Sequence, residues 1–82
     1  NQNKMSRLLY FTAAWCAPCN QLNPQLTQLT LPFTTIDVDT QSDVALKHHV
    51  RNIPCFIKLD SDGNELCRLV GHNVTINNIK NL

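Results

Sequence analysis

The feature that most constrains this chain is a pair of cysteines, Cys16 and Cys19, placed between segments of different periodicity. The apolar run before them, residues 7–12, is rich in strand-forming residues and predicts a buried strand. The segment after them, 22–29, carries leucines at i, i+4 and i+7, the spacing of an amphipathic helix. We therefore expect the pair at a helix N-terminus, where backbone N–H groups and the helix dipole stabilise a thiolate. This arrangement suits a thiol–disulfide exchange centre.

The length predicts a single domain over residues 1–82 with a small core. We expect residues 1–5 to be a tag remnant or a disordered N-terminus, or to follow a removed signal peptide. The apolar runs are too short to span a membrane. A net charge of +1 without a basic stripe gives no reason to expect nucleic acid or an anionic membrane as partner. The four cysteines could form a secreted disulfide scaffold, but strong apolar periodicity and few glycines and prolines favour a redox or metal role.

The remaining patterns predict the order β-α-β-α-β-β-α. The expected segments are a strand at 7–12, a helix at 16–29 kinked at Pro24, a strand at 33–38, a helix at 43–49 with Thr40 or Ser42 as N-cap, strands at 55–59 and 66–70, and a last helix capped by Asn73. Strands separated by helices imply parallel pairing, and the final hairpin adds an antiparallel edge. We therefore expect a central mixed four-stranded sheet flanked by helices on both faces.

With this order, the chain resembles the thioredoxin family from about residue 7 to its C-terminus. The motifs that carry the resemblance are Trp15-Cys16-Ala17-Pro18-Cys19, Pro24 in the following helix, Ile53-Pro54, and Val70-Gly71. The resemblance implies a minimal thioredoxin-like fold, closer to glutaredoxin in length because there is no room for the family's first strand and helix. It also implies a cis peptide bond at Ile53-Pro54, facing the cysteine pair.

The sequence departs from the family pattern at two functional positions. The family's buried Asp, six residues before the first cysteine, corresponds to Tyr10, and its Lys partner corresponds to Thr35. That carboxylate is thought to help remove the proton from the second cysteine, so another base or water must serve here. Asp37 and Asp39, at the end of the second strand, are candidates for that base. Otherwise we expect Tyr10 to be a core residue.

Cys16 is the predicted nucleophile and should be partly exposed, and Cys19 is the predicted resolving thiol. A static, unreactive pair and a metal pair remain alternatives. We expect no metal, because the other candidate ligands, Cys55, Cys67, His48, His49 and His72, show no second close spacing.

Eight residues are predicted to contact the substrate: Trp15, Ala17, Pro18, Ile53, Pro54, Val70, Gly71 and His72. Trp15 would pack beside the pair and screen it from water. The Ile53 backbone would pair with an extended substrate segment. The segment 70–72 would form the opposite lip of the site, with Gly71 permitting close backbone approach.

Outside the family motifs, Cys55 and Cys67 are expected on the same face of the hairpin but not opposite each other, and hence as buried free thiols. His48 and His49 are expected at the end of the short helix, where a cation is favourable.

The predicted function is reduction of protein disulfides, with the redox-active Cys16–Cys19 disulfide as the only redox group and no bound cofactor. Ala17 and Pro18 supply no charge to stabilise the thiolate, which favours a reductant with a potential on the order of −270 mV. A reductase with flavin and NADPH, or a glutaredoxin-type route, would recharge it. We expect a cytoplasmic monomer acting in electron transport and cell redox homeostasis. The alternatives are an extracytoplasmic disulfide oxidase or isomerase, and a non-catalytic metal- or protein-binding module of the same fold.

Overall fold

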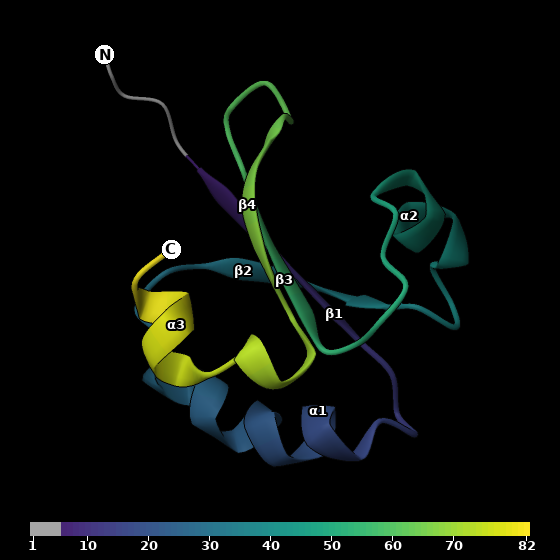
Figure 1. Cartoon of the computed structure of the whole chain (residues 1–82), viewed down its shortest axis with the longest axis vertical. Helices are drawn as coiled ribbons and strands as arrows, with labels where there is room; N and C mark the ends of the chain where they lie inside the picture. Colours follow the sequence, from purple (N-terminus) through teal and green to yellow (C-terminus); the bar gives the residue numbers. More distant parts are fainter. Residues whose placement is uncertain (1–5) are drawn as a thin grey trace.

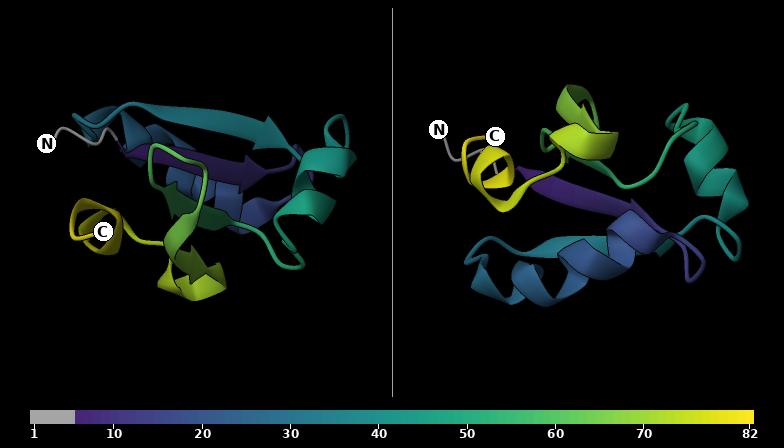
Figure 2. Two further views of the ribbon diagram at one scale, coloured as in Figure 1. Left: turned by 90° about the horizontal axis from the view of Figure 1, so that it is seen from above. Right: turned by 60° about the horizontal axis from the view of Figure 1, so that its bottom comes forward.

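A mixed sheet of four strands organises this computed structural model, which describes residues 6–82. The strands are β1 (Arg7–Thr12), β2 (Phe33–Asp37), β3 (Cys55–Leu59) and β4 (Glu65–Val70). They lie in the order β2-β1-β3-β4 (Figure 2). The predicted mixed four-stranded α/β sheet is thus confirmed, whereas the prediction about residues 1–5 lies outside the described part of the chain.

Five short helical segments connect and cover the strands. They are α1 (Ala17–Leu22), the 3-10 helix η1 (Asn23–Gln28), α2 (Ser42–Lys47), the 3-10 helix η2 (Gly71–Asn73) and α3 (Ile76–Lys80). Figure 1 shows α1 and α3 together on one side of the sheet and α2 apart from them. Within residues 6–82, no helix has the length and apolar character needed to cross a membrane.

Alternation along the strands divides the core between the two faces of the sheet. On one face, Leu8 and Tyr10 of β1 pack with residues of α1, η1 and α3. On the other, Phe11 of β1 packs with Ala45 of α2 and with Cys55 and further residues of β3. Both faces of the sheet are therefore covered, as expected.

The direction of β3 differs from the prediction. β1 and β2 are parallel, but β3 runs antiparallel to β1, and β4 runs antiparallel to β3. Ile36 near the end of β2 and Cys55 at the start of β3 both pair with Phe11, so β3 starts at the edge where β2 stops. At six residues, α2 spans only about 9 Å, too short to carry the chain back along the sheet for a parallel strand.

The predicted single helix over 16–29 is instead an α-helix followed by a 3-10 helix. α1 ends at Leu22, and Pro24 lies in the first turn of η1. Proline has no N–H to donate to the preceding turn, so the i→i−4 hydrogen-bond ladder cannot continue through Pro24. The predicted kink thus takes the form of a change in helix type.

Two predicted helix caps are wrong. Gln41 occupies the N-cap position of α2 without a side-chain hydrogen bond, and Ser42 is already the first helical residue. At the C-terminal end of the chain, Thr75 caps α3 by accepting a hydrogen bond from the Asn78 N–H, at 3.1 Å. Asn73 cannot serve there because the chain first makes the 3-10 turn η2, which places the start of α3 two residues later than a cap at Asn73 requires.

The hairpin register places Cys55 and Cys67 on opposite faces of the sheet. Cys55 is opposite Val70, and Cys67 is opposite Lys58. A register one residue away from the predicted one moves every side chain of β4 to the other face, so the expectation that the two cysteines share a face is wrong. Both are free thiols, as expected, but only Cys55 is buried, whereas Cys67 is half-buried.

Candidate active site

Cys16 and Cys19 form a disulfide at the start of α1, with their Cα atoms 5.2 Å apart. Cys16 is the N-cap residue, with extended backbone angles of φ −84° and ψ 103°. Its Sγ accepts a hydrogen bond from the backbone N–H of Cys19 at 3.2 Å. That N–H has no acceptor within the helix, so it is available to stabilise negative charge on the Cys16 sulfur after reduction.

The sulfur pair lies in an apolar setting. Cys19 is fully buried and Cys16 is only 4% exposed, in a cluster with Ala13 against which Val38 and Ile53 pack. The predicted partial exposure of Cys16 is therefore wrong for the disulfide form, because its sulfur is turned inward toward the Cys19 N–H. Its neighbours Ala17 and Pro18 are exposed.

The Ile53-Pro54 bond is cis, which confirms the expectation drawn from the family resemblance. Pro54 is buried, and its carbonyl accepts a hydrogen bond from the Gly71 N–H at 2.8 Å. Since Ile53 packs against the cysteine cluster, this loop lies between the disulfide and the end of β4.

Gly71 has a φ of +63°, the left-handed region where residues with a Cβ are disfavoured. A Cβ placed on it would meet no atom within 4 Å. The glycine is therefore required within the chain by its backbone angle, and the space beside it is open. No neighbouring atom of the described chain would clash with a side chain at position 71, so close packing does not account for the glycine.

A hollow of about 220 Å³ lies beside the pair, between α1 and the segment that follows β4. Its lining is Pro18, Gln21, Leu22, Gln25, Pro54, Gly71, His72, Val74 and Thr75. Four of the eight predicted contact residues thus meet around one hollow: Pro18, Pro54, Gly71 and His72. The other four, Trp15, Ala17, Ile53 and Val70, lie outside its lining.

Sequence reasoning missed the polar part of this lining. Gln21 and Gln25 follow Pro18 at i+3 and i+7, so helical spacing alone could have placed them on its face. Thr75 carried no such signal, because its position depends on how the segment after β4 folds back toward α1.

Trp15, the residue predicted to pack beside the sulfur pair, lies at the surface. Its side chain is 67% exposed, and its indole N–H donates to Asp39 Oδ2 at 2.9 Å. Asp39 is in turn held by its own N–H, which donates to Asp37 Oδ1 at 2.8 Å. The Asp39 carboxylate, one of the two candidate bases, is therefore engaged in orienting the Trp15 ring.

Tyr10 is a core residue, as predicted, and it lies close to the resolving cysteine. Its hydroxyl donates to Asn23 Oδ1 at 2.7 Å and lies 3.5 Å from the Cys19 carbonyl oxygen. Burial raises the pKa of the Tyr10 phenol above its ordinary value of 10.0, so the group is neutral at physiological pH. It cannot replace a carboxylate as general base for Cys19. Thr35, the residue at the position of the family's Lys, pairs with Tyr10 across β1 and β2.

His48 does not provide the cation expected at the end of α2. Burial, and then the positive charges of Lys47 and Arg68, lower the pKa of His48 below its ordinary value of 6.5. Its imidazole is therefore neutral at pH 7.

Among the residues that the structure describes, no three His, Cys, Asp or Glu side chains gather in a group able to hold a metal ion.

Comparison with known proteins agrees with this geometry. A family model described as thioredoxin matches residues 1–81. The thioredoxin of Chlamydia pneumoniae is 44% identical over 69 residues, covering 78% of this chain and 67% of the relative. A TPR repeat-containing thioredoxin of Arabidopsis thaliana is 39% identical over 77 residues, covering 83% of this chain and 20% of the relative.

The fold is also found among solved structures. The reduced Schistosoma mansoni thioredoxin pre-protein superposes with a TM-score of 0.82 at 26% identity, covering 96% of this chain and 75% of that one. The chain spans only 20 to 56% of the length of five of the curated thioredoxins that it matches.

Proposed function

The chain belongs to the thioredoxin family, and we propose that it reduces protein disulfides through Cys16 and Cys19. The observation that carries the proposal is the joined cysteine pair at the start of α1, with the Cys19 N–H directed at the Cys16 sulfur. Reduction of this disulfide supplies the two thiols that the reaction needs.

The reaction proceeds by two exchanges of sulfur partners. The Cys16 thiolate attacks one sulfur of a substrate disulfide, which forms a mixed disulfide and expels the other substrate sulfur as a thiolate that takes up a proton. Cys19 then loses its proton and attacks the Cys16 sulfur. This step restores the Cys16–Cys19 disulfide and releases the second substrate thiol. Two electrons pass from the protein to the substrate.

The substrate segment is proposed to lie along the Ile53-Pro54 loop and in the adjoining hollow. The hollow supports this placement, because it joins Pro18, beside the attacking sulfur, to Pro54 and His72. Trp15, Ala17 and Val70 would border the same segment from outside the hollow.

We propose that the reaction runs in the reducing direction in a cytoplasmic setting. Ala17 and Pro18 offer no charge to stabilise the thiolate form, which favours a low potential. The free thiols of Cys55 and Cys67 fit a reducing compartment. A flavin- and NADPH-dependent reductase, or a glutaredoxin-type route, would regenerate the dithiol for electron transport and redox homeostasis. We propose that the protein acts as a monomer.

The proposal is tested by redox titration of the pair combined with reduction of insulin. The wild type should show one two-electron transition near about −270 mV and should accelerate insulin reduction by dithiothreitol. Cys16→Ser should abolish the acceleration, whereas Cys19→Ser should accumulate a mixed disulfide that is visible by mass spectrometry.

Other outcomes identify the alternatives. A potential above about −200 mV would indicate an oxidase or isomerase. The absence of a reversible transition would reject exchange chemistry and leave a binding module.

A further inference from the structure

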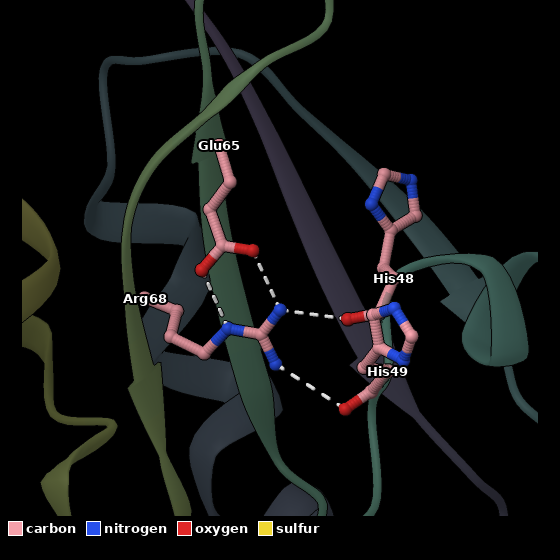
Figure 3. Close-up of polar contacts among 4 residues, drawn as sticks. All are labelled: His48, His49, Glu65 and Arg68. Carbon is pink, nitrogen blue, oxygen red and sulfur yellow. Dashed lines mark hydrogen bonds and ion pairs between the residues drawn. The ribbon is translucent and has the colours of Figure 1, made fainter.

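A charged pair on β4 reaches across to the end of α2. Arg68 Nε donates to Glu65 Oε2, and Arg68 Nη2 donates to Glu65 Oε1, both at 2.6 Å. The two side chains are 27% and 36% exposed. Two parallel hydrogen bonds of this kind fix the plane of the guanidinium group (Figure 3).

The fixed guanidinium directs its remaining donors at the chain that leaves α2. Arg68 Nη2 donates to the His48 carbonyl at 2.7 Å, and Nη1 makes a longer contact, 3.5 Å, with the His49 carbonyl (Figure 3). The last carbonyls of a helix receive no hydrogen bond from the helix itself, so their donors must come from elsewhere. His49 has a φ of +56°, which turns the backbone out of the helix at this point.

Within residues 6–82, Arg68 is the only side chain that donates a hydrogen bond to either of these carbonyls. His48 is neutral at pH 7, because burial and the neighbouring Lys47 and Arg68 lower its pKa. Arg68 keeps its charge, since the hydrogen bond that it donates to Glu65 raises the pKa of Arg68 and lowers the pKa of Glu65. The contact therefore persists over the whole physiological pH range.

The segment held by Arg68 leads directly to the cis bond at the candidate site. Residues 48–54 connect α2 to β3, and their far end is held by the Gly71 N–H, which donates to the Pro54 carbonyl at 2.8 Å. The loop is thus attached to β4 through the Arg68 side chain at one end and to the residue after β4 at the other. Between these attachments, Ile53 packs against the cysteine cluster.

We propose that Arg68 is a positioning residue, whose guanidinium holds the 48–54 loop so that Ile53 and Pro54 stay in place beside the cysteine pair. Its effect on turnover rests on the proposed function, whereas its effect on the loop does not. If the loop adopts its binding position only part of the time without Arg68, the apparent affinity for a protein substrate falls by that fraction.

The test compares Arg68→Gln with the wild type and with Arg7→Gln, which removes an exposed arginine on β1, two strands away from β4. We measure kcat and KM for insulin, the rate with a small aromatic disulfide, and amide hydrogen exchange along the chain. Arg68→Gln should raise KM for insulin about fivefold, with kcat and the small-disulfide rate within about twofold. Exchange should accelerate in the 48–54 loop alone. Arg7→Gln should match the wild type, and Glu65→Gln should lie between the two.

Three results would overturn the proposal. They are an unchanged KM, a small-disulfide rate that falls together with the insulin rate, and exchange that accelerates evenly along the whole chain, which marks a general loss of stability. Should Arg68→Gln fold poorly, Arg68→Lys retains the charge with fewer donors and should give a smaller rise in KM. If the wild type reduces neither disulfide, the proposed function fails, and exchange in the 48–54 loop still decides the role of Arg68.

Discussion

At the scale of single residues, Tyr10 best shows how this chain departs from the family pattern. It occupies the position of the family's buried carboxylate, and its ring stacks on Phe56 with a centroid distance of 4.8 Å and meets Phe33 edge-on. Its hydroxyl is held by Asn23. Because the phenol is buried and neutral, its contribution is packing and one hydrogen bond rather than proton transfer.

Replacing Tyr10 by Phe should therefore lower the stability of the protein without changing the rate of disulfide exchange. Loss of the hydrogen bond to Asn23 should lower the free energy of unfolding by about 1 kcal/mol, as measured by urea denaturation. The rate at which Cys19 resolves a preformed mixed disulfide should equal that of the wild type in a single-turnover experiment. A resolving step slowed tenfold in this variant would contradict the assignment and make the phenol a participant in the reaction.

At the scale of elements, local chemistry decides where the short helices begin. α3 has only five residues, so a cap satisfies a large share of its free N–H groups. The Thr75 hydroxyl performs this role for the Asn78 N–H. Asn78 is also held through its side chain, which donates to the Asn73 carbonyl at 2.8 Å, so that Asn73 contributes its backbone rather than its side chain.

Thr75→Ala should consequently destabilise the protein by about 1 kcal/mol in urea denaturation, whereas Thr75→Ser should retain most of the cap. Asn73→Ala provides the matched control, since it keeps the backbone carbonyl and should change stability by less than about 0.5 kcal/mol. If the Asn73 variant lost more stability than the Thr75 variant, the cap assignment would be wrong.

At the scale of the whole molecule, the contacts around Arg68 make stability depend on pH. The pKa of His48 is lowered on folding, so below its ordinary value of 6.5 the unfolded chain binds a proton there more readily than the folded one. The pKa of Glu65 is also lowered, chiefly by the Arg68 hydrogen bond. Its contribution is full above the ordinary value of 4.5 and is lost as pH falls through the folded value. Both groups therefore weaken the fold on acidification.

Urea unfolding between pH 7.5 and pH 3, about the range that spans both groups, should resolve them. The wild type should lose stability in two stages. His48→Gln should flatten the stage that starts near pH 6.5, and Glu65→Gln the stage that starts near pH 4.5. Each effect should stay below about 1 kcal/mol, since the groups are partly exposed. Profiles parallel to that of the wild type in both variants would show that neither group is linked to folding.

Features that depend on neighbouring residues could be predicted from the sequence. Strands 7–12 and 55–59 have the bounds expected from their apolar runs, and the cysteine pair lies at the start of a helix. Periodicity, turn residues and cap chemistry act over a few positions, so they can be interpreted without knowing the rest of the fold. The cis bond at Pro54 followed from the family resemblance, because local preference alone favours the trans form.

Features in which distant segments meet could not be predicted, because they depend on how the folded chain packs. The direction of β3 depended on the short length of α2. Cys67 and Cys55 lie on opposite faces because of the register between β3 and β4, and a shift of one residue in that register would move the side chains of β4 to the other face. Ile53, which packs against the buried Cys16, is distant from it in the chain, and the contact of Arg68 is with the end of α2. A residue pattern indicates the structure of each segment separately. How two distant segments are arranged against each other is decided by the packing of their side chains.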